Sequence, residues 1–141
     1  AAIETIATFF ISDNVTKFLR RKAQLYTLFS VVFYMQRENI AVEQCQKDRL
    51  EYFVKLYSVF NNDMDLSGEI SDSEKILFDW LKKYKLASSE GLNKHTNRMI
   101  RYNVMKDFLF GLTDELEEAQ STLYEKMQAT STDNAEEDLK D

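Results

Sequence analysis

The scarcity of turn-forming residues is the feature that most constrains how this chain folds. Its 141 residues include no proline and only three glycines, Gly68, Gly91 and Gly111. β-Sandwiches and β-barrels need turn residues about every ten positions, whereas helices tolerate their absence. Hydrophobic residues make up 44% of the chain, which is enough to fill the core of one domain. We therefore predict an all-α fold, an irregular bundle of five or six helices.

Apolar residues that recur at steps of three and four positions predict where these helices lie. One long helix is expected over residues 15–38, and Ser71 with Glu74 is expected to form a capping box that opens a later helix. Two further helices are predicted over residues 2–11 and 96–112, and a third begins at residue 41 or 47 and ends at residue 60. A last, polar helix is predicted to end near residue 128. An aromatic stripe is predicted to be core rather than a surface on which ligands stack, and its residues are Phe18, Tyr26, Phe29, Phe33, Phe53 and Phe60. The predicted core is Leu28, Phe29, Val32, Phe53, Phe60, Trp80, Ile100 and Phe108.

Acidic residues are concentrated at the C-terminal end. Residues 129–141 hold five acidic residues and one basic residue, so they carry −4 of the net charge of −6 and leave the rest close to neutral. This segment has too few apolar residues to bury a surface of its own. We therefore expect a helical domain over residues 1–128, followed by a disordered acidic tail over residues 129–141.

The chemistry open to the chain is limited by its single cysteine, Cys45, and its single histidine, His95. Together they exclude an internal disulfide and a Cys/His metal cluster. Three isolated glycines cannot form a phosphate-binding loop, and no nucleophile has an evident activating partner. No apolar run approaches the ~20 residues that a membrane-spanning helix needs. We expect a cytoplasmic domain without enzymatic activity.

Residues 63–74, with the sequence DMDLSGEISDSE, match the spacing of a calcium-binding EF-hand loop. Such a loop presents oxygen ligands at positions 1, 3, 5, 7, 9 and 12, because a hard cation takes six to eight oxygens and alternate residues of a tight loop point inward. Gly68 stands at position 6, where the loop turns sharply, and Ile70 at the apolar position 8. The predicted ligands are Asp63, Asp65, Ser67, the carbonyl group of Glu69, Ser71 and Glu74.

The flanks of this loop fit the pattern less well. EF-hand loops usually have apolar neighbours on both sides, whereas here the neighbours are Asn62 and Lys75, and no second loop is present to pair with this one. An unpaired loop is expected to bind Ca²⁺ weakly. The alternative is an ordinary connection between two helices, in which Glu74 serves only the capping box.

Two further stretches resemble a known family. Residues 17–33, KFLRRKAQLYTLFSVVF, resemble a helix in which basic residues precede Lys-x-x-x-Tyr-x-Leu-Phe. Residues 84–109, YKLASSEGLNKHTNRMIRYNVMKDFL, resemble a small-residue turn that leads through Gly-x-Asn to Arg-x-x-Arg on a helix. In this order they resemble the C-terminal helical part of the GmrSD-type prokaryotic defence proteins, over roughly residues 1–112.

In that family the catalytic chemistry belongs to a ParB-like domain with an Asp-Gly-Gln-Arg motif, and an HNH-like nuclease domain often follows. This chain has neither motif. The resemblance therefore implies a non-catalytic interaction or scaffold domain of a larger nucleic-acid-directed protein. Its expected partners are other domains or subunits and, through them, nucleic acid, with no membrane. A calcium-binding module is the alternative function.

Basic residues near the start of the predicted 96–112 helix suggest a phosphate or DNA contact. Arg98 and Arg101 are three positions apart and so share one helical face, and Lys94 lies just upstream. A helix N-terminus with nearby cations can hold a phosphate group. The alternative is that these arginines pair with acidic side chains of a neighbouring helix.

Overall fold

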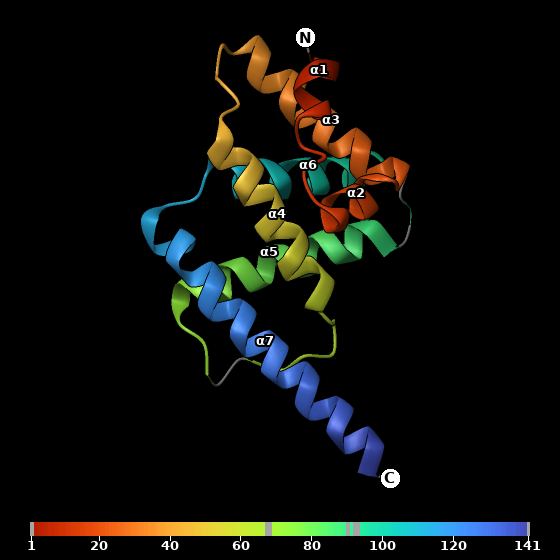
Figure 1. Ribbon diagram of the computed structural model, residues 1–141, viewed down its shortest axis with the longest axis vertical. Helices are drawn as coiled ribbons and strands as arrows, with labels where there is room; N and C mark the ends of the chain where they lie inside the picture. The colour runs from red at the N-terminus through yellow and green to blue at the C-terminus, as the bar shows by residue number, and fades with distance from the viewer. Residues whose placement is uncertain (1, 67–68, 90, 92–93, 141) are drawn as a thin grey trace.

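The computed structural model describes residues 2–66, 69–89, 91 and 94–140, with side chains described up to residue 130. Within these ranges the chain forms seven packed helices and no strand, which confirms the all-α prediction (Figure 1). The helices are α1 (Ala2–Ala7), α2 (Asp13–Leu19), α3 (Lys22–Arg37), α4 (Gln44–Val59), α5 (Asp72–Ser89), α6 (His95–Phe110) and α7 (Asp114–Lys140).

Several helix ends are set by the local signals that the sequence contains. The Ser12 side chain accepts a hydrogen bond of 3.2 Å from the Val15 N–H and so caps α2. At the start of α5, the Ser71 N–H donates to Glu74 Oε1 (2.9 Å) and the Glu74 N–H donates to Ser71 Oγ (3.2 Å). This is the predicted capping box, which is confirmed. α6 ends at Phe110, immediately before Gly111.

The single helix predicted over residues 15–38 is wrong, because the chain breaks at Arg20 and Arg21 into α2 and α3. At 100° per residue, Leu19 and Leu28 would lie about 180° apart on an unbroken helix. Both side chains are nevertheless fully buried. The break re-orients the chain, so that the apolar side of each short helix faces the same core.

The core is centred on Phe53 of α4. Its ring lies 5.0 Å from the ring of Tyr84 and 4.9 Å from that of Phe108, measured between centroids. The ring of Phe18 packs edge-on at 5.8 Å. Aromatic rings from α2, α4, α5 and α6 thus meet at one point, in the tilted and edge-to-face arrangements that their quadrupoles favour.

Most of the predicted core is confirmed. Leu28, Val32, Phe53, Phe60 and Phe108 are buried, and Trp80 and Ile100 are partly buried against the core. The prediction is wrong for one face of α3, where Tyr26, Phe29 and Phe33 are 64%, 38% and 48% exposed. On an unbroken helix these three residues would lie in phase with Val15 and Phe18. The break between α2 and α3 places them on the outer side.

A buried polar contact joins α3 to α5. The Tyr84 hydroxyl donates a hydrogen bond to Gln24 Oε1, and Gln24 Nε2 donates to Ser88 Oγ at 3.3 Å. Tyr84 and Gln24 are both almost fully buried. Burial raises the pKa of the Tyr84 phenol well above its ordinary value, so the hydroxyl keeps the proton that it donates.

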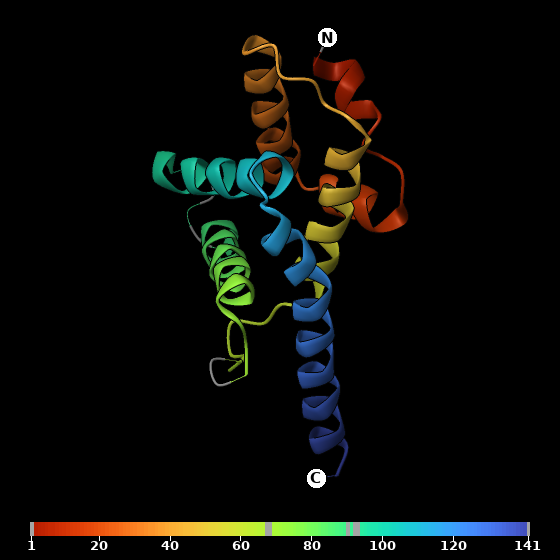
Figure 2. The same ribbon diagram turned by 90° about the vertical axis from the view of Figure 1, so that its left-hand side faces the viewer.

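α7 packs against α4 and α5 and then extends away from the bundle, toward the end opposite α1 and α3 (Figures 1 and 2). The structure continues this helix to Lys140, through most of the segment predicted to be a disordered acidic tail. No helix in the described part of the chain combines the length and hydropathy that a membrane crossing needs.

Replacement of Tyr84 by Phe tests the buried contact between α3 and α5. We expect Tyr84→Phe to lower the free energy of unfolding by about 1–3 kcal/mol, because it leaves Gln24 Oε1 buried without its donor. Urea unfolding measures the loss, and the exposed Tyr26→Phe is the matched control, expected to change stability by less than about 0.5 kcal/mol. Equal stabilities of the two variants would contradict this role of the contact.

Candidate functional site

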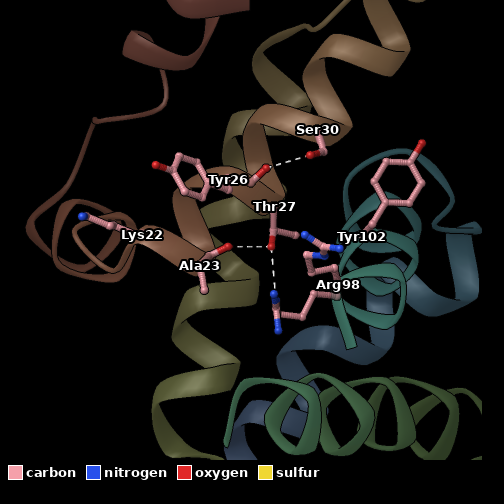
Figure 3. A pocket seen from close by; sticks show the side chains of 8 residues that line it. Lys22, Ala23, Tyr26, Thr27, Ser30, Arg98 and Tyr102 are labelled. Carbon is pink, nitrogen blue, oxygen red and sulfur yellow. Dashed lines mark hydrogen bonds between the residues drawn. The ribbon is translucent and has the colours of Figure 1, made fainter. Parts of the chain in front are cut away.

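A basic pocket of about 400 Å³ opens between α3 and α6. Lys22, Tyr26 and Ser30 lie on the α3 side, and Arg98 and Tyr102 lie on the α6 side (Figure 3). Ala23, Thr27 and Arg101 complete the lining. None of these eight residues is acidic, whereas three carry a permanent positive charge. The pocket therefore offers cations and hydroxyl groups, a combination that suits an anion.

Arg101 forms the floor of this basic pocket, and its side chain is buried. Its guanidinium group donates to the Ala87 carbonyl oxygen at 2.6 Å and to Thr27 Oγ1 at 3.4 Å, and so links α6 to α5 and α3. Thr27 Oγ1 in turn donates to the Ala23 carbonyl oxygen at 2.7 Å. Ala87 belongs to α5 and Thr27 to α3, so these two hydrogen bonds of Arg101 hold three helices together beneath the pocket.

The three basic residues predicted as phosphate contacts lie in different places. Arg98 is exposed at the pocket, and Arg101 lies beneath it. Lys94 precedes α6 as its N-cap residue, and its side chain packs near Gly91 outside the pocket lining. The structure thus brings two of the three predicted residues together and adds Lys22, which was not among the predicted phosphate contacts. Lys22 belongs to a run of basic residues, and only the fold shows that it lines the same pocket as Arg98.

The calcium-like loop is the second predicted site, and its ligand positions are described except for Ser67, which lies outside the described residues. Asp63 and Asp65 are exposed, and the Asp63 N–H donates to Asn61 Oδ1 at 3.0 Å. Glu74 differs from both, since only 3% of its surface is exposed. Among the described residues, no group of three or more acidic, histidine or cysteine side chains is close enough to hold a metal ion.

Lys126 of α7 binds two of the predicted calcium ligands. Its Nζ atom donates to the Glu69 carbonyl oxygen at 2.8 Å and to Glu74 Oε1 at 2.9 Å. These oxygens belong to positions 7 and 12 of the loop. A protein ammonium group therefore contacts two oxygens that a calcium ion would use, and it fastens the loop to α7. Glu74 Oε2 is buried and has no hydrogen-bond partner among the described residues.

The carboxylate of Glu74 stays charged despite its burial. Burial alone would raise the pKa of Glu74, but hydrogen bonds from Ser71 and Lys126 and the charge of Lys126 outweigh it and lower the pKa below its ordinary value. The sequence predicted the bond to Ser71 from local spacing. It gave no signal for Lys126, which lies 52 positions further along the chain.

The structure predicts different roles for Arg98 and Arg101. We expect Arg101→Met to lower the free energy of unfolding by about 2–3 kcal/mol, because methionine keeps the apolar stem but removes the buried hydrogen bonds to Ala87 and Thr27. Thermal or urea unfolding checks this. The control is Arg98→Met at the exposed rim, for which we expect a change below about 0.5 kcal/mol. A larger loss for Arg98→Met would reverse the assignment.

Comparisons of this chain with protein-family models, with curated proteins and with solved structures found no match.

Proposed function

We propose that this chain is a non-catalytic helical interaction domain of a larger nucleic-acid-directed protein, and that the basic pocket between α3 and α6 contacts nucleic-acid phosphate. The observation that carries the proposal is the lining of the pocket. Lys22 and Arg98 flank it, Arg101 lies beneath it, and no acidic residue is among the eight that line it. Phosphate groups attract this combination of cations and hydroxyl donors.

The rest of the pocket supports the same ligand chemistry. Tyr26 and Tyr102 also line the pocket, and a phenolic hydroxyl group can donate to a phosphate oxygen. The Ser30 hydroxyl is already used, since it donates to the Tyr26 carbonyl oxygen at 2.9 Å (Figure 3). Arg98 projects from the first turn of α6, where the helix dipole adds partial positive charge. The net charge of −6 does not oppose this, because residues 129–141 carry −4 of it and α7 extends away from the helices that form the pocket (Figure 1).

The family resemblance supports the wider setting of the proposal. The two stretches that resemble GmrSD-type defence proteins, residues 17–33 and 84–109, contribute α3 and α6, which form the pocket. In the proposed arrangement the catalytic chemistry belongs to another domain or subunit. The present domain would then hold the nucleic acid beside that site.

Replacement of Arg98 tests the phosphate contact. We expect Arg98→Ala to weaken binding of DNA by about 1.5 kcal/mol, roughly tenfold in Kd, because one charged hydrogen bond to phosphate is lost. The slope of log K against log salt concentration should fall by about 1 in magnitude. Fluorescence anisotropy with a labelled DNA at several salt concentrations measures both quantities.

The matched control is Lys82→Ala, which removes one positive charge from the exposed surface of α5 near the 61–70 loop. Its DNA affinity and salt slope should equal those of the parent. If Arg98→Ala and Lys82→Ala change binding equally, the attraction comes from overall charge, and the pocket has no special role.

Binding of Ca²⁺ by the 63–74 loop is the second candidate function. One observation favours it: a cation already contacts the Glu69 carbonyl and Glu74 Oε1, while Glu74 Oε2 is buried and, within the described part of the chain, has no hydrogen-bond partner. A divalent ion entering the loop would have to displace the ammonium group of Lys126 from both oxygens. Its binding to the parent chain is therefore weakened by competition with a group that is always present.

We expect the rise in thermal midpoint between EDTA and about 2 mM Ca²⁺ to be larger in Lys126→Met than in the parent, because only the folded loop binds the ion and its competitor is gone. At a Kd near 1 mM the gain in the parent is below about 1 kcal/mol. Glu74→Gln serves as the control that removes the charged ligand, and it should show no Ca²⁺-dependent shift. The same shift in all three proteins would end the calcium hypothesis.

A further inference from the structure

The outer face of α3 carries a continuous strip of exposed side chains. Lys22, Tyr26, Phe29, Phe33 and Arg37 follow one another at steps of three or four residues, so they share one face of the helix. All five are exposed, and the strip is about 22 Å long at 1.5 Å per residue. It has a cation at each end and three aromatic rings between them.

The strip connects the basic pocket with two apolar hollows along α1. Tyr26 lines both the basic pocket and a hollow of about 330 Å³ that also involves Ile3 and Phe29. Phe29, Phe33 and Arg37 line the next hollow, of about 460 Å³. α1 and α3 lie side by side along this surface in both views (Figures 1 and 2). The basic pocket is thus one end of a longer groove.

The aromatic rings of the strip are presented to solvent in an ordered way. The rings of Phe29 and Phe33 are nearly parallel, with an interplanar angle of 9° and centroids 6.1 Å apart. The guanidinium carbon of Arg37 lies 5.9 Å from the centroid of the Phe33 ring. Parallel exposed rings bordered by cations form a surface on which flat aromatic ligands can stack while their phosphates meet positive charge.

We propose that the α3 strip binds a single-stranded nucleic acid, with bases stacked on Phe29 and Phe33 and phosphates held by Arg37 and by the basic pocket. This inference rests on the proposed function and deepens it by naming the class of nucleic acid. Access to the faces of the bases favours a single strand. In a duplex the base faces are covered by their neighbours and only the edges are exposed, so exposed protein rings can stack only on unpaired bases.

The charge pattern distinguishes this ligand from an apolar protein segment. A protein docked on the rings would have to place acidic groups near both ends of the strip, about 22 Å apart. A single strand carries a phosphate at every nucleotide, with a base attached between phosphates. Its repeating charges and rings therefore match the order of groups along the strip, which is a cation, three aromatic rings and a second cation.

The experiment compares one sequence of about 16 nucleotides, as a single strand and as a duplex, by fluorescence anisotropy with the full 141-residue chain. We expect tighter binding of the single strand. Phe33→Leu keeps an apolar side chain but removes the ring, and it should weaken single-strand binding about tenfold and leave duplex binding unchanged. The matched control is Phe10→Leu, a ring that is 41% exposed outside the strip and should have no effect.

Equal affinity of the parent for single strand and duplex would overturn the inference, as would a Phe33→Leu variant with unchanged single-strand affinity. If Phe33→Leu leaves binding intact but dissociates a homo-oligomer in sedimentation analysis, the strip is a protein interface and the inference is wrong.

Arg98→Ala separates the two proposals. If it weakens both forms of DNA while Phe33→Leu does nothing, the phosphate pocket survives and only the single-strand inference fails. If neither form of DNA binds the parent, both fail.

Discussion

The buried polar contacts among α3, α5 and α6 determine how the rest of the molecule is arranged. Gln24 and Thr27 extend from the inner face of α3, where they meet the Tyr84 hydroxyl and the Arg101 guanidinium group. A buried polar group that loses its partner costs free energy, so these contacts permit few other packings of the three helices. They fix the orientation of α3 about its axis, and that orientation decides which of its residues reach solvent.

Both candidate features of the surface follow from this constraint. Because Gln24 and Thr27 face inward, Tyr26, Phe29 and Phe33 must face outward. Because Arg101 is held by Ala87 and Thr27, Arg98, three positions earlier on α6, is carried to the rim of the pocket beside α3. The residues proposed to contact ligand thus lie on α3 and α6, and the buried hydrogen bonds of Gln24, Thr27 and Arg101 hold these helices in place.

Local signals in the sequence were enough to predict the all-α class, the capping box of Ser71 and Glu74 and most of the core. Local signals did not predict the features that depend on how the helices pack against one another. The chain has neither proline nor glycine at the break between α2 and α3, at Arg20 and Arg21. Apolar residues at helical spacing continue from Val15 to Phe33 and therefore predicted one helix. These residues are in phase only on one continuous helix. Leu19 and Leu28 lie on either side of the break and are nine positions apart, so on one continuous helix they would point in opposite directions. Two buried leucines on opposite sides of one helix indicate that the helix is interrupted between them.

The calcium-like loop shows the same limit at a single residue. The spacing of residues in the sequence identifies oxygen atoms that can surround a cation, but it does not reveal whether a metal ion or a protein ammonium group binds them. An ammonium group on a neighbouring helix has a high effective concentration at the loop, because α7 is already packed against α5. Lys126 therefore competes with any free ion without loss of translational freedom, and its contacts with Glu69 and Glu74 tie the loop to α7. A loop with the ligand spacing of a metal site can in this way serve as a joint between helices.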